Sequence, residues 1–214
     1  FLASGLGITL LIALLAAIFG LIIGVILSVM QNHKGFQKLA YIYIDIFRGT
    51  PIILQLSIIY FAVPQFVNVL LRATGSNQIF LIAALPAALI AFSLNSAAYL
   101  SEVIRSGINS VDKGEIEAAV SLGLKKWHIY KDVILPTAFR NSFPALMNEL
   151  ITLIKESSIV SIIGIQDLMR RSNIVTAQTY LYLEPLIVIG IIYYVVIKIL
   201  TILSRKLEMR LQYD

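Results

Sequence analysis

The chain has 214 residues, of which 58% are hydrophobic and 14% charged, and its net charge is +5. A soluble domain does not have that balance, whereas a bundle of membrane helices does. The absence of cysteine excludes disulfides, thiolate catalysis and cysteine-based metal sites, and two histidines are too few for a histidine metal cluster. The basic residues lie between apolar runs, which indicates membrane topology rather than nucleic-acid binding.

Five apolar segments predict an all-α integral membrane protein with five transmembrane helices in a single domain, residues 1–214. Each segment is close to the ~20 residues that a helix needs to cross a bilayer. A backbone in lipid must satisfy its own hydrogen bonds, which favours helices. The fourth segment differs from the others because it contains Glu149, Lys155 and Glu156. The expected spans are residues 6–30, 51–71, 79–100, 143–165 and 186–203.

The basic residues predict the orientation of these spans. They gather in the first loop, in the long loop between the third and fourth spans, and at the C-terminus. Because the basic side of a membrane protein faces the cytoplasm, five crossings place the N-terminus outside and the C-terminus in the cytoplasm. The long loop, which includes residues 112–136, is then cytoplasmic.

Two shorter stretches have their own predicted structure. Residues 35–49 mix apolar residues with lysines, which is typical of a short amphipathic helix along the inner membrane surface. Thr50-Pro51 opens the second span, since proline is tolerated at a helix start. Residues 166–184 form a long outer loop that we expect to pack against the outer mouth of the bundle.

The cytoplasmic loop carries helix signals at both ends of a short segment. Asp112 and Glu115 have the spacing of a capping box, which predicts a helix over residues 113–122. Gly123 can take the left-handed conformation that ends such a helix. One face of this helix would be small and apolar, with Ile116, Ala119 and Val120.

A second cytoplasmic helix is expected to follow, with Trp127, Tyr130 and Ile134 on one side, and to end at Pro136. The simplest interpretation of both helices is a linker that lies on the membrane surface. However, alanine and glycine allow the close approach of another backbone, whereas a lipid-facing helix usually offers large side chains. The cytoplasmic helices, residues 112–136, are therefore predicted to couple to a partner protein.

The same loop resembles the EAA loop of the membrane subunits of ABC importers. The resemblance lies in the spacing of Glu117-Ala118-Ala119, Gly123, Val133 and Leu135-Pro136, with valine where the family has isoleucine. Three further motifs resemble the polar amino acid permeases, the histidine and arginine importers in particular. They are Arg48-Gly49-Thr50-Pro51, Asn95-x-x-x-Tyr99-x-x-Glu102 and Lys155-Glu156-Ser157-Ser158, and the resemblance covers nearly the whole chain from Gly7.

The resemblance implies a complex in the bacterial inner membrane. Two copies of the permease form the path, a separate subunit binds ATP and magnesium, and an extracytoplasmic binding protein delivers an amino acid. This chain has no glycine-rich phosphate loop, so it needs no cofactor of its own and is not an enzyme by itself. The residues that the resemblance assigns to ATPase coupling are Glu117, Ala118, Ala119, Gly123, Leu135 and Pro136.

Polar residues within the predicted spans are candidates for the substrate path, because such residues are expensive in lipid. Their spacing places Asn95 with Tyr99 and Glu102 on one helix face, and Glu149 with Glu156 on another. The candidates are Asn95, Tyr99, Glu102, Glu149, Thr152, Lys155 and Glu156.

Each candidate also has a structural interpretation. Glu102 has Arg105 one turn away at the membrane edge, Asn95 could bond across helices, and Lys155 could snorkel. Glu149 could hold the EAA loop in place, and Arg48 marks the inner interface.

If the third and fourth spans line one cavity, it contains more carboxylate than ammonium. A basic amino acid is then the expected cargo, carried by alternating access through a homodimeric importer. The alternatives are an ion-coupled secondary transporter and a channel subunit. The sequence leaves open which amino acid is carried, whether the second membrane subunit is identical or related, which residues form the gate, and whether residues precede Phe1.

Overall fold

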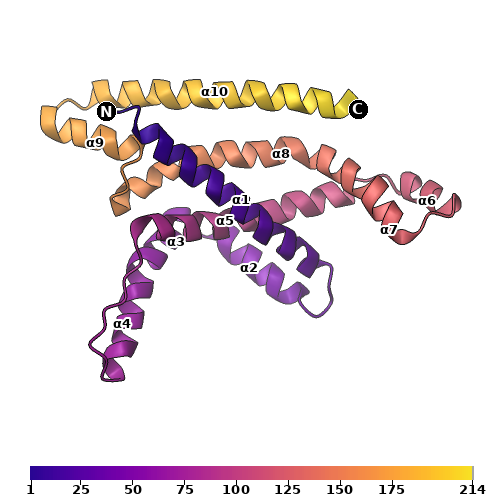
Figure 1. The fold of residues 1–214 in the computed structure, drawn as a ribbon, viewed down its shortest axis with the longest axis horizontal. Coiled ribbons are helices and arrows are strands. Elements are labelled where there is room, and N and C mark those ends of the chain that lie inside the picture. The colour runs from indigo at the N-terminus through magenta and orange to yellow at the C-terminus, as the bar shows by residue number, and fades with distance from the viewer. Residues whose placement is uncertain (214) are drawn as a thin grey trace.

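The computed structural model describes residues 1–213, and within them the chain is helical with no β-strand (Figure 1). Its elements are α1 (Gly5–Gln31), α2 (Gln37–Gly49), α3 (Ile52–Ser57), η1 (Ile58–Ala62), α4 (Val63–Ala73), α5 (Ala84–Asn109), α6 (Lys113–Ser121), α7 (Lys126–His128), η2 (Ile129–Ile134), α8 (Leu135–Glu156), η3 (Ser157–Ile163), α9 (Leu168–Thr179) and α10 (Leu183–Tyr213). The elements η1 and η2 are π-helical and η3 is a 3₁₀ helix.

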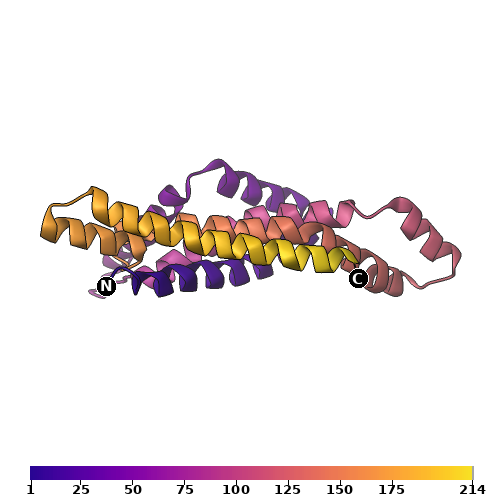
Figure 2. The same ribbon diagram turned by 90° about the horizontal axis from the view of Figure 1, so that it is seen from above.

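The helices form a long, shallow bundle. α5, α8 and α10 follow its long axis, and α1 crosses them obliquely (Figures 1 and 2). α6 and α7 form a tip at one end, and α9 lies at the other (Figure 1). The N-terminus lies near the α9 end, whereas α10 runs toward the α6 end, so the chain begins and ends on opposite sides of the bundle.

α1 packs closely on α5 because both helices carry small residues where they meet. A Cβ added at Gly20 would lie 3.0 Å from the Cβ of Ser96, and one added at Gly24 would lie 3.1 Å from the Cβ of Leu100. Helices in lipid associate by such close packing rather than by the hydrophobic effect. The surrounding core contains the buried residues Ile12, Ala13, Ala16, Ala88, Ala91 and Phe92.

Within residues 1–213, four helices are long and apolar enough to cross a membrane: Gly5–Gln31, Ile52–Ala73, Ala84–Asn109 and Leu183–Leu211. They coincide with the first, second, third and fifth predicted spans. The predicted segment 143–165 lies in α8 and η3, and α8 is not among the four. Its charged residues Glu149, Lys155 and Glu156 set it apart from the other helices.

Two prolines each follow a π-helical segment. One of these segments explains why the prediction that a helix ends at Pro136 is wrong. Pro136 was expected to end a helix, but it is the second residue of α8, and the chain stays helical from Lys126 onward. Proline cannot donate to the i−4 carbonyl and collides with it, and the wider π turn of η2 accommodates the ring. The same arrangement joins η1 to Pro64, where α4 leaves the bundle (Figure 1).

α2 is part of the bundle, which differs from the predicted helix along the inner surface. Its residues Ala40 and Ile44 are buried. The hydroxyl of Tyr43 donates to the carbonyl oxygen of Leu94, in the middle of α5, at 2.7 Å. α2 therefore runs beside the third span rather than lying beyond its end. Pro51 caps α3 directly after the break, as the prediction of a proline at a helix start requires.

The tip confirms the predicted helix over residues 113–122, since α6 ends one residue earlier. Asp112 caps it by accepting from the backbone N–H of Gly114 at 2.6 Å. Gly123 has a φ of +76°, as predicted. The N–H groups of Gly123 and Leu124 donate to the carbonyls of Val120 and Ala119, which is the Schellman arrangement.

The predicted outer loop contains α9, which packs against the N-terminal end of α1. Asp167 caps α9 by accepting from the N–H groups of Met169 and Arg170. The N–H of Leu168 donates to the hydroxyl of Thr9 on α1 at 3.4 Å. These contacts fix the start of α9 on the bundle.

Candidate functional site

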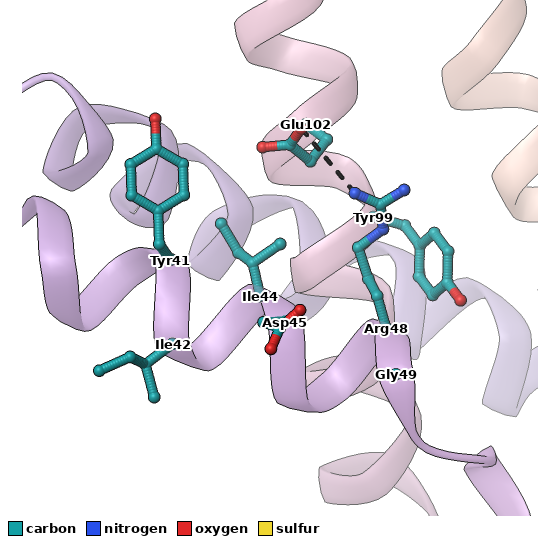
Figure 3. A pocket seen from close by; sticks show the side chains of 8 residues that line it. All are labelled: Tyr41, Ile42, Ile44, Asp45, Arg48, Gly49, Tyr99 and Glu102. Carbon is teal, nitrogen blue, oxygen red and sulfur yellow. Dashed lines mark ion pairs between the residues drawn. The ribbon is translucent and has the colours of Figure 1, made fainter.

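Two cavities lie on either side of one polar wall, which α2 and α5 build together. The first has a volume of about 680 Å³ and lies along α2, and the second has about 570 Å³ and lies between α5 and α8. Arg48, Tyr99 and Glu102 line both cavities. We call these three residues the partition. In Figure 3, Arg48 extends from α2 toward Glu102, and the Tyr99 ring lies beside its guanidinium.

Glu102 is the centre of a charge network that joins three helices. Arg105 donates to it from Nε at 3.2 Å and from Nη2 at 2.9 Å. The Nε2 of Gln31, at the end of α1, donates to Oε1 of Glu102 at 2.9 Å. The structure thus confirms the pairing of Glu102 with Arg105 and adds Gln31. Hydrogen bonds within the chain therefore already engage both oxygens of the Glu102 carboxylate.

Arg48 contributes the weakest contact to this network. Its Nη1 lies 3.8 Å from Oε2 of Glu102, and its guanidinium carbon lies 5.3 Å from the centre of the Tyr99 ring. The side chain is 45% exposed. Sequence reasoning treated Arg48 only as an interface marker. The available signal was its place in the last turn of α2, directly before the break at Thr50, where a side chain can reach the next helix.

Glu149 lines the second cavity from α8, opposite the partition. One of its oxygens accepts from the hydroxyl of Ser96 at 2.9 Å. Among the residues that the structure describes, Glu149 takes part in no ion pair. The same wall of the cavity carries Asn141, Ser142 and Asn148. In the described part of the chain, Glu149 is therefore a carboxylate without a basic partner on a wall of polar, uncharged residues, in a cavity that Arg48, Glu102 and Arg105 also line.

Asn95 does not reach either cavity lining. It is only 6% exposed, and its Nδ2 donates to the carbonyl of Phe47 and to Oε1 of Gln55. Gln55 in turn donates to Thr50 and to the carbonyl of Phe47. This amide pair satisfies backbone groups at the break between α2 and α3. Asn95 thus bonds across helices, which is the structural interpretation of this residue.

The other three candidate path residues also lie outside the two cavities. Lys155 lines a separate cavity of about 280 Å³ with residues of α9 and α10, including Met169 and Tyr193. Thr152 and Glu156 are half-buried and line neither of the two larger cavities. Of the seven predicted path residues, the structure brings together Tyr99, Glu102 and Glu149.

The tip formed by α6 and α7 presents the second candidate site. Large apolar side chains are exposed there: Val120 at 59%, Leu122 at 81% and Trp127 at 66%. Glu117 and Ala118 are exposed as well, whereas Ala119 is buried against the rest of the tip. Leu135 and Pro136 begin α8 and are exposed. The exposed surface of the tip is therefore large and apolar rather than the small face predicted from Ile116, Ala119 and Val120, because Ala119 is buried. Clusters of exposed apolar residues, unlike single ones, mark interfaces.

The comparisons with known proteins agree on one class of membrane protein. Residues 16–213 match the family described as binding-protein-dependent transport system inner membrane component. The arginine transport system permease protein ArtQ of Bacillus subtilis (strain 168) is 49% identical over 214 residues, which cover 99% of this chain and 93% of that protein. The putative glutamine transport system permease protein GlnP of Rickettsia felis is 44% identical over 182 residues, covering 85% and 78%.

Solved structures share the fold. A crystal structure of an amino acid ABC transporter with histidines has a TM-score of 0.85 and 39% identity, covering 98% of this chain and 93% of that one. An inward-facing structure of the MetNI methionine ABC transporter has a TM-score of 0.74 at 19% identity, covering 98% and 95%. The latter likeness shows the fold alone.

Proposed function

The chain belongs to the family of binding-protein-dependent transport system inner membrane components, as an amino acid ABC transporter permease, and we propose that it imports a basic amino acid by alternating access. Glu149 carries the choice of cargo. It is the carboxylate of the second cavity that has no basic partner within the described residues. A cationic side chain would supply the missing charge.

Glu102 does not share this role, although it lines the same cavity and was expected there with Glu149. Arg105 and Gln31 already occupy its oxygens. The similarity to an arginine transport permease supports a basic cargo, while the similarity to glutamine permeases makes a neutral amino acid the competing candidate. The two cargo classes differ by one charge, so a matched pair of ligands separates them.

We propose the following assembly for this permease. Two copies form the translocation path, each tip docks on a subunit that binds ATP and magnesium, and a binding protein delivers the amino acid from outside. The exposed apolar side chains of the tip support this docking, because no other part of the described residues packs over them. ATP-driven closure of the partner subunits would move both tips together and switch the opening of the cavities.

We further propose five spans, with α8 and η3 as the fourth. Small residues bring α5 and α8 together at Gly107, and the polar cavity between them explains why α8 is less apolar than the other spans. Ends of the chain on opposite sides of the bundle support an odd number of crossings. The N-terminus is then outside and the tip is cytoplasmic in a bacterial inner membrane.

Binding of arginine and of citrulline to the purified permease–ATPase complex tests the basic cargo. The two ligands have nearly the same shape, but citrulline has no side-chain charge. We expect arginine to bind roughly tenfold or more tightly, since hydrogen bonds to charged groups contribute about 1.5–3 kcal/mol. Glu149→Gln should abolish this preference. Glu156→Gln is the matched control outside both cavities and should keep it. Equal binding of the two ligands by the wild type would contradict a basic cargo.

A further inference from the structure

Arg48 is the side chain that closes the partition from the α2 side. With Tyr99 and Glu102 it lines both cavities, and it is the only one of the three that comes from α2 (Figure 3). Its guanidinium joins α2 to α5 through Glu102 and the Tyr99 ring. A change in what Arg48 binds would therefore change the wall between the cavities.

The contacts around Glu102 show which of its partners can leave. Arg105 is held by two hydrogen bonds, at 3.2 and 2.9 Å, whereas Arg48 lies 3.8 Å away. If Arg48 moved, Arg105 and Gln31 would still satisfy the carboxylate. Release of Arg105 would break both of its hydrogen bonds. Arg48 is thus the exchangeable member of the network.

An amino acid cargo brings an α-carboxylate that needs a partner in the cavity. Asn95 is buried and already bonded, and Arg105 is committed to Glu102. Lys155 lines a different cavity. Arg48 is close to half exposed, and a guanidinium binds a carboxylate with two parallel N–H donors.

We propose that Arg48 binds the α-carboxylate of the cargo by leaving Glu102, while Glu149 binds the cationic side chain from the opposite wall. This inference rests on the proposed import of a basic amino acid. Arg48 exchanges one carboxylate for another, so its charge stays paired throughout. The exchange breaks the contact of Arg48 with Glu102, while Tyr43 and Asn95 still hold α2 on α5, so occupation of the second cavity opens the partition to the first.

Agmatine tests the role of Arg48, because it is arginine without the α-carboxylate. Binding is measured on the permease–ATPase complex without the binding protein. We expect the wild type to prefer arginine over agmatine by roughly tenfold to a hundredfold, the range for hydrogen bonds to a charged group. Arg48→Gln should lower arginine binding to the level of agmatine and leave agmatine binding unchanged. Arg72→Gln, an exposed arginine on α4, is the matched control.

The outcomes separate this inference from the proposed function. Glu149→Gln should weaken arginine and agmatine alike, because both keep the guanidinium. An Arg48→Gln variant that still prefers arginine over agmatine, or that loses both ligands equally, would overturn the role of Arg48. A wild type that prefers arginine over citrulline keeps the basic cargo even then. If Arg48→Gln does not fold, Arg48→Lys should show a reduced preference for arginine. Lysine keeps the positive charge but cannot offer two parallel N–H donors to a carboxylate.

Discussion

The partition and the tip are stabilised in opposite ways. At the partition, an amide from α1 and charged groups from α2 and α5 meet across long stretches of chain, and Gln31 lies 71 residues from Glu102. At the tip, neighbours in sequence make the contacts: Asp112 caps α6, and Gly123 and Leu124 close it. The partition holds partly exposed polar groups that line two cavities, whereas the tip exposes apolar residues on a frame fixed by local hydrogen bonds.

Under the proposed function, this difference separates ligand binding from coupling to the ATPase. A locally stabilised tip suits docking of a partner, and a network with one weak contact suits a response to a ligand. Substitutions in the two regions should therefore have different consequences even when they destabilise the protein equally. The substitutions below test that separation.

The largest effect is expected for Gly107→Val, at the wall between α5 and α8. A Cβ at this position would overlap Ser142 Oγ and lie 2.7 Å from the carbonyl oxygen of Ala138. Overpacking of this kind costs about 1–3 kcal/mol or more. We expect loss of the second cavity and a lower unfolding temperature of the complex. Gly7→Val, on an open surface of α1, is the control and should leave the unfolding temperature unchanged. Equal unfolding temperatures for Gly107→Val and Gly7→Val would contradict the close packing of α5 on α8.

A smaller effect on stability, but a specific effect on coupling, is expected for Gly123→Val. Gly123 has φ +76° and Gly75 has φ +78°, and neither has a neighbour within 4 Å of its Cβ position. A left-handed backbone costs other residues about 1–2 kcal/mol. Gly75→Val should therefore destabilise the chain by as much as Gly123→Val does. Of these two glycine variants, only Gly123→Val should lower the amount of amino acid imported per ATP hydrolysed. Glu117→Lys should lower the same ratio, because it reverses an exposed charge at the tip. Normal coupling in Gly123→Val would count against docking at the tip.

The smallest effect is expected for Asp112→Ala, which removes the cap of α6. Loss of an N-cap costs about 1 kcal/mol, so the first turn of α6 should fray. Hydrogen exchange at the N–H of Gly114 and its neighbours measures this fraying. Ser4→Ala is the control, because Ser4 precedes α1 without a capping hydrogen bond. Unchanged exchange in Asp112→Ala would show that packing, rather than the cap, holds the start of α6.

How far the sequence predicts this structure depends on the range of each interaction. The start of α6 and the left-handed Gly123 follow from residues a few positions apart, and both predictions are confirmed. Pro136 was interpreted from its local preference alone, but a π turn lets the helix continue. The second span is likewise bent at η1, so an apolar run of suitable length did not predict a straight helix.

The candidate cavity was predicted less completely, because its walls come from distant segments. Helical spacing correctly related Tyr99 to Glu102, which share α5. Spacing did not show that Asn95, on the same helix, turns to the break between α2 and α3. Nor did it bring Arg48 to Glu102, since that contact depends on α2 folding back beside α5. Contacts across helices require the packing of the bundle, which no local pattern specifies.

The proposed function requires this chain to import a basic amino acid at the expense of ATP hydrolysed by its partner. Uptake into vesicles that contain the complete complex, with the binding protein outside and ATP inside, tests this most directly. Labelled arginine, glutamine and glutamate are compared with and without ATP. We predict uptake of arginine over the other two that stops without ATP. Preference for glutamine or glutamate, or uptake that continues without ATP, would contradict the account.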